Sequence, residues 1–108
     1  MMLRCDYDDA IPRQMAARVQ FVARVFALRV RFVRYDRTRR GHHMVVDCRG
    51  AALSPTETVL AQALLGSDWK REAYNAGRAR VLSRQPSFWR ESSRWNVLYH
   101  RHWRKVDV

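Results

Sequence analysis

The spacing of apolar residues changes along the first half of the chain, and this change limits the folds that the chain can adopt. Residues 2–8 alternate between apolar and polar side chains, which is the pattern of a half-buried strand. Residues 15–26 carry apolar side chains at helical spacing, whereas 28–32 and 42–48 return to alternation. The sequence therefore predicts strand, helix, strand and strand in that order, with a long polar loop between the last two.

Two further helices and a final strand are expected in the second half. Ser54, Pro55 and Glu57 form the signature of a capped helix start. A third helix is expected to run from about 68 to 84, and residues 95–100 have the composition of a strand. This order fits an α+β fold with a ferredoxin-like or RRM-like split βαβ sheet, four strands and helices on one face. In this topology we expect the first and third strands to be neighbours at the centre of the sheet.

The length of 108 residues predicts one domain over residues 1–108. No apolar run approaches the roughly 18–20 residues of a membrane span, so we expect no membrane contact. The N-terminus meets acidic residues before any apolar segment, which predicts a cytoplasmic protein. Cys5 and Cys48 lie in apolar alternations, so we expect them to be buried and reduced.

The charge of the chain indicates a polyanionic partner. The formal net charge is +11, and all but two of the 21 basic residues are Arg. Arg binds phosphate with a planar fork and stacks on bases, so nucleic acid is the natural partner. A GC-rich genome would explain Arg in place of Lys, but it would not explain the excess of positive charge.

Three of the ten acidic residues lie within positions 6–9 of this basic chain. Asp6 and Asp8 are two apart, so on a strand they project from the same face. Paired carboxylates on one face are suited to a divalent cation, which makes Asp6 and Asp8 candidate ligands of Mg²⁺ or Mn²⁺. The alternative is an acidic turn in which Asp8 or Asp9 caps the helix after Pro12.

The two most distinctive motifs are Asp6-Tyr7-Asp8 and Thr38-Arg39-Arg40-Gly41-His42-His43. Together, in this order and with a helix between them, they resemble the catalytic core of the archaeo-eukaryotic primase superfamily. The resemblance covers residues 3–48. It implies a small primase-like or polymerase-palm-like domain, with Asp6, Asp8 and His43 as catalytic residues and nucleotides as substrates. The third acidic position of that family has no secure counterpart here, so both metal-dependent nucleotidyl transfer and a non-catalytic binding protein stay open.

Three arginines near the second motif, Arg37, Arg39 and Arg40, are candidate nucleic-acid ligands. Near the C-terminus, aromatic side chains alternate with arginines, which suits single-stranded bases and adds Arg101, Trp103 and Arg104 as candidates. The sequence thus predicts a protein that binds single-stranded DNA or RNA. Two alternatives are a helix-turn-helix over residues 54–84, with a basic second helix, and a structural nucleic-acid-binding protein. A purely structural His43 and rings that only close the core are the simpler interpretations.

Overall fold

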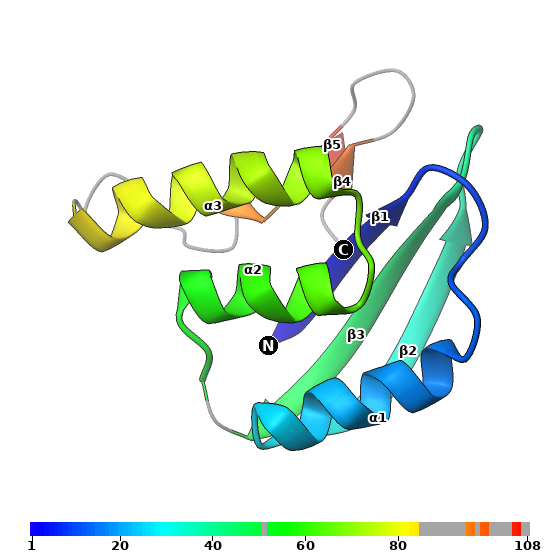
Figure 1. Cartoon of the computed structure of the whole chain (residues 1–108), viewed down its shortest axis with the longest axis horizontal. Helices are drawn as coiled ribbons and strands as arrows, with labels where there is room; N and C mark the ends of the chain where they lie inside the picture. Colours follow the sequence, from blue (N-terminus) through cyan, green and yellow to red (C-terminus); the bar gives the residue numbers. More distant parts are fainter. Residues whose placement is uncertain (51, 85–94, 97, 100–104, 107–108) are drawn as a thin grey trace.

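The computed structural model describes residues 1–50, 52–84, 95–96, 98–99 and 105–106 of the chain (Figure 1). Its elements are β1 (Met2–Tyr7), α1 (Met15–Val25), β2 (Leu28–Arg37), β3 (His42–Gly50), α2 (Pro55–Leu64), α3 (Trp69–Arg84), β4 (Leu98–Tyr99) and β5 (Lys105–Val106). The fold is α+β, as the apolar spacing predicts. The second strand extends to Arg37, five residues beyond the alternation seen in the sequence, because it pairs with β3 along that whole length.

Within the described residues, the main sheet has three strands in the order β1-β3-β2. Both outer strands run antiparallel to β3, so β1 and β2 are parallel to each other and α1 connects them. The first and third strands are neighbours, as expected. Their register places Cys5 opposite Met44 and Asp6 opposite His43. The two sequence motifs therefore lie on adjacent strands.

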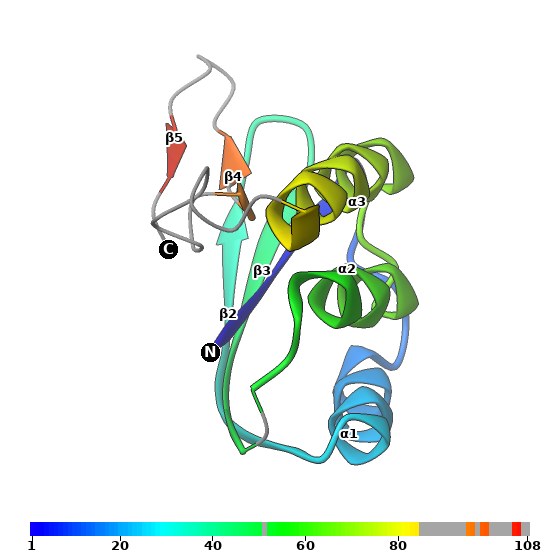
Figure 2. The ribbon, with the colours of Figure 1, turned by 90° about the vertical axis from the view of Figure 1, so that its left-hand side faces the viewer.

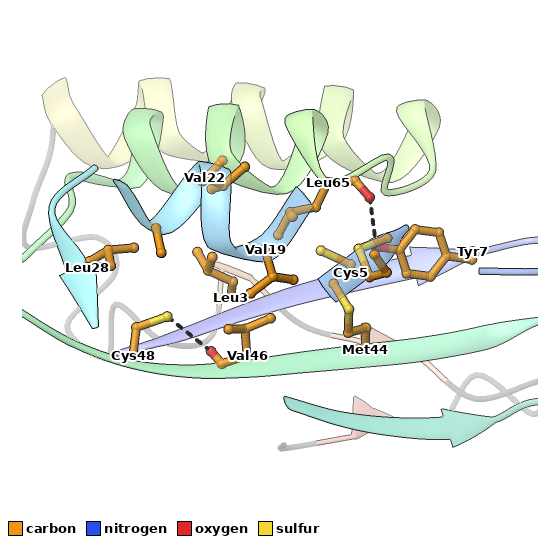
Figure 3. Packing of buried hydrophobic residues seen from close by; sticks show 13 residues of the cluster. Leu3, Cys5, Tyr7, Val19, Val22, Leu28, Met44, Val46, Cys48 and Leu65 are labelled. Carbon is orange, nitrogen blue, oxygen red and sulfur yellow. Dashed lines mark hydrogen bonds between the residues drawn. The ribbon is translucent and has the colours of Figure 1, made fainter. Parts of the chain in front are cut away.

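The core lies between this sheet and the helices α1 and α2 (Figure 3). Leu3 and Cys5 from β1 and Val46 from β3 point toward Val19 and Val22 of α1. The apolar stripe expected for residues 15–26 is thus the buried face of α1. Burial of this face supplies the main favourable term for folding.

The two cysteines and one tyrosine of this core are shielded from water. Cys5 and Cys48 are free and buried, which confirms the sequence prediction. Burial raises the pKa of the Cys5 thiol to about 12 and also raises that of Cys48. Burial likewise raises the pKa of Tyr7, whose hydroxyl donates to the Leu65 carbonyl. All three groups are therefore neutral at physiological pH.

Of the expected fourth strand, the described residues 98–99 do not extend the main sheet. Leu98–Tyr99 pairs instead with Lys105–Val106 in a separate two-stranded sheet, on the side of the main sheet away from the helices (Figure 2). The outer edge of β1 is occupied by side chains from the helices. The Arg4 N–H donates to Gln62 Oε1 at 2.8 Å, and the Arg4 carbonyl accepts from Arg71 at 2.7 Å. Strand pairing at this edge is therefore replaced by side-chain hydrogen bonds.

Helix starts follow the sequence rules in one case and depart from them in another. Ser54 and Glu57 form the expected capping box at the start of α2. The expected cap after Pro12 is wrong. Helix α1 begins at Met15, and Gln14, in the left-handed region, precedes it without any side-chain cap. Asp8 and Asp9 are therefore not helix caps, which removes the simplest explanation for the acidic segment.

No helix in the described part of the chain is long and apolar enough to cross a membrane.

Candidate functional site

The two sequence motifs pack directly against each other through Gly41. A Cβ atom at this position would overlap the Tyr7 carbonyl oxygen and come within 2.7–2.8 Å of the Asp8 backbone. Only glycine allows the segment between β2 and β3 to approach the end of β1 this closely. Gly41 was singled out in the sequence only as part of a motif. In the fold it allows close packing between the two motifs.

The turn that carries Gly41 is closed by its own hydrogen bonds. The Thr38 N–H donates to the Gly41 carbonyl at 2.8 Å, and the Gly41 N–H donates to the Thr38 hydroxyl at 3.0 Å. His42 then fastens this turn to the acidic segment, because its Nδ1 donates to the Asp9 carbonyl at 3.0 Å. We call residues 6–9 the acidic turn and residues 37–41 the basic loop.

His43 and Asp6 face each other across β1 and β3. The Asp6 Oδ1 lies 3.4 Å from His43 Nε2. The His43 side chain is only 4% exposed, whereas that of Asp6 is 31% exposed. The structure thus brings two of the three candidate catalytic residues together, with the carboxylate at the surface and the imidazole beneath it.

Asp8 follows β1 and is exposed, beside a further carboxylate that the sequence did not assign to this site. The negative charge of Asp68 is the largest cause of a raised Asp8 pKa, followed by burial, Asp6 and Asp9; Lys70 opposes them. The Asp68 N–H also donates to the Asp6 carbonyl at 2.6 Å. The α2–α3 connection therefore brings Asp68 to the acidic turn.

Asp68 also caps the start of α3, because its Oδ2 accepts from the Arg71 N–H. Nothing in the sequence pattern relates it to the acidic turn some 60 residues earlier. Despite this gathering of carboxylates, no group of three or more His, Cys, Asp or Glu side chains in the described segments is arranged to hold a metal ion. Binding of Mg²⁺ or Mn²⁺ by Asp6 and Asp8 stays a prediction.

The basic loop presents its arginines to solvent. Arg37, Arg39 and Arg40 are exposed, and the loop that carries them packs against the acidic turn at Gly41. The remaining nucleic-acid candidates, Arg101 and Arg104 with Trp103, lie outside the described residues. One end of the molecule therefore combines exposed cationic side chains with a set of surface carboxylates.

A second polar group lies beside the outer edge of β1 and was missed by sequence reasoning. It is buried, with Gln62 and Asn75 fully buried and Glu72 only 4% exposed. We call it the β1-edge cluster, and its members are Gln62, Ser67, Arg71, Glu72, Asn75 and Asn96. Five of them lie within residues 62–75, and Asn96 follows 21 residues after Asn75. No motif relates them, so only the tertiary structure reveals the cluster.

This cluster bears on the helix-turn-helix alternative. Two of the basic side chains of α3 bind within the molecule. Arg71 donates to the Arg4 carbonyl, and Arg78 donates to Asn75 and to the Trp95 carbonyl. The exposed face of α3 carries Trp69 and Tyr74, which are 73% and 72% exposed. A basic recognition face is thus less developed on α3 than its sequence suggests.

Comparisons with protein-family models, with curated proteins and with solved structures found no match to this chain.

Proposed function

We propose that this chain is a nucleic-acid-binding protein that resembles a minimal primase or polymerase palm with a ferredoxin-like sheet. Single-stranded DNA or RNA would bind at the end of the molecule where the basic loop meets the acidic turn. The observation that carries the proposal is the close approach at Gly41, which holds the two motifs together. A chance likeness between two short motifs would not require them to be in contact.

The charge distribution gives this end its chemistry. The chain has a net charge of +11. Arg39 and Arg40 lie in a turn that is closed by a hydrogen bond between Gly41 and Thr38. A backbone fixed in this way lowers the entropic cost of bringing their guanidinium groups to phosphate oxygens. The adjacent carboxylates would repel phosphate unless a cation lies between them, so they limit where on this end a phosphate binds.

The enzymatic form of the proposal is metal-dependent nucleotidyl transfer with Asp6, Asp8 and His43. The described residues do not supply a three-ligand group for the ion, so substrate phosphates would have to complete its coordination. Metal binding has its own test. If Asp6 and Asp8 bind Mn²⁺, millimolar Mn²⁺ should raise the melting temperature of the wild type but not that of Asp6→Asn with Asp8→Asn. Equal shifts in both proteins would contradict metal binding by these residues.

Nucleic-acid binding is tested by comparing two double variants on a labelled single-stranded oligonucleotide. Arg39→Ala with Arg40→Ala should weaken affinity by about tenfold or more at low salt, because two charge-assisted phosphate contacts are lost. Arg78→Ala with Arg80→Ala removes two arginines from the second half of α3 and serves as the matched control. A larger loss in the control, together with a preference for duplex, would favour the helix-turn-helix.

A further inference from the structure

Strand β2 is an edge strand with an unusually exposed set of side chains. Among the residues that the structure describes, the main sheet ends at β2, which pairs there with β3 on one side only. Six of its ten residues are exposed, and each is either basic or aromatic: Arg29, Arg31, Phe32, Arg34, Tyr35 and Arg37. An edge strand normally carries charge to prevent pairing with other strands, but that need does not explain exposed rings.

The two rings lie between arginines along the strand. Phe32 is 44% exposed and Tyr35 is 45% exposed. The register places Phe32 opposite Asp47 and Tyr35 opposite Met44, so the rings project from opposite faces of β2. Because β2 is at the edge of the sheet, side chains from both faces border the same free edge.

The charge of β2 selects among the partners that this edge could bind. The strand contains four arginines and one acid, Asp36. Arg34 pairs with Asp36 at 3.2 Å, and Arg31 lies 3.5 Å from Asp47. The arginines of both ion pairs are about half exposed, so the pairs are weak and an incoming phosphate can compete with them. A second copy of the chain would bring arginines against arginines, so an anionic partner is favoured.

We propose that single-stranded nucleic acid binds along the free edge of β2. Its phosphates contact the four arginines of the strand, and its bases stack on Phe32 and Tyr35. The inference rests on the proposed function and extends it, because the basic loop continues directly from the end of β2 at Arg37. The bases of a duplex are stacked on one another, so their faces are not accessible to the two rings. An acidic peptide has no regular array of bases. The exposed rings therefore favour single-stranded nucleic acid over a duplex and over an acidic peptide.

The test compares the affinity of a labelled oligothymidylate with that of an abasic strand of equal length at low salt. Phe32→Leu with Tyr35→Leu keeps the apolar bulk of both side chains but removes their aromatic faces. Phe21→Leu is the matched control, because Phe21 lies on α1 and is 63% exposed. Melting temperatures show that each variant is folded.

We expect the β2 double variant to lose at least about fivefold in oligothymidylate affinity per ring, the change that ~1 kcal/mol of stacking produces. Its affinity for the abasic strand should equal that of the wild type, and Phe21→Leu should change neither. Wild-type affinity of the folded double variant for oligothymidylate would overturn this inference while leaving the Arg39 and Arg40 result intact. Equal competition by polyglutamate would also overturn it, in favour of an acidic peptide. Absence of any wild-type binding would overturn the proposed function together with this inference.

Discussion

The acidic turn with its basic loop and the β1-edge cluster are both polar, but they differ in how their charges are partnered. In the β1-edge cluster, buried Glu72 accepts hydrogen bonds from Gln62, Ser67, Arg71 and Asn75. At the acidic turn, carboxylates lie at the surface and repel one another, as the raised pKa of Asp8 indicates. The buried group is therefore organised for stability. The surface group leaves its charges accessible to solvent.

The hydrogen bonds around Asp6 connect the two regions. Its N–H donates to the Ser67 hydroxyl at 3.0 Å, and that hydroxyl donates to Glu72 at 2.7 Å. The Asp6 side chain, in the acidic turn, faces His43. The buried cluster thus fixes the backbone of β1 from one side, while the acidic turn uses the same strand to present carboxylates on the other.

The largest expected effect comes from removing the centre of the buried cluster. Glu72→Ala should lower the free energy of unfolding by about 3–5 kcal/mol, because Arg71 and the amides around it lose their common acceptor in a buried site. Urea denaturation measures this change. The matched control is Glu57→Ala, an exposed glutamate in the capping box of α2, for which about 1 kcal/mol is expected. Equal decreases in the free energy of unfolding of the two variants would contradict a special structural role for the buried cluster.

A smaller effect is expected where the acidic turn and the basic loop touch. Gly41→Ala should destabilise the protein by about 1–3 kcal/mol, because the added methyl group would force the Tyr7 and Asp8 backbone away. Gly77→Ala offers the opposite case, since nothing lies within 4 Å of its Cβ position and the residue is helical. It should stabilise by about 0.5–1 kcal/mol. Thermal unfolding of the two variants measures both changes in stability. A Gly41→Ala variant as stable as the wild type would mean that the two motifs are not held in contact.

The smallest effect concerns Asp8 and its pH dependence. A carboxyl whose pKa is raised in the folded state costs stability when it is charged, and this cost disappears as the pH falls through that pKa. Asp8→Asn should therefore be more stable than the wild type at neutral pH, by less than about 1 kcal/mol because the site is exposed. The difference should vanish in acid, below the ordinary range of aspartate. Melting curves from neutral to acid pH measure it, and a variant less stable than the wild type at neutral pH would contradict repulsion at the acidic turn.

The parts of this fold that were predictable are those governed by local rules. Alternation identified β1 and β3, the Ser54 capping box identified α2, and the expected neighbourhood of the first and third strands matches the pairing of β1 with β3. Two local predictions failed. The helix after Pro12 begins without a side-chain cap, and the C-terminal strand pairs outside the main sheet.

The site was predictable only in part, for a physical reason. Asp6 and His43 lie on strands whose pairing was expected from the topology, whereas the register that sets them opposite each other is not fixed by the sequence pattern. Asp68 reaches the acidic turn because the α2–α3 connection folds back onto the edge of β1. The buried Gln62 and Asn75 depend on the same packing. Polar residues on helices usually face solvent, and only the tertiary structure shows that Gln62 and Asn75 face inward.

The most direct test of the central claim is the salt dependence of binding to a single-stranded oligonucleotide. If the arginines near the acidic turn contact phosphates, the logarithm of affinity should fall linearly and steeply with the logarithm of salt concentration. Arg39→Ala with Arg40→Ala should make that slope shallower by roughly 1.4, the counterions released by two phosphate contacts to a single strand. A flat salt dependence, or no detectable binding at low salt, would contradict the account.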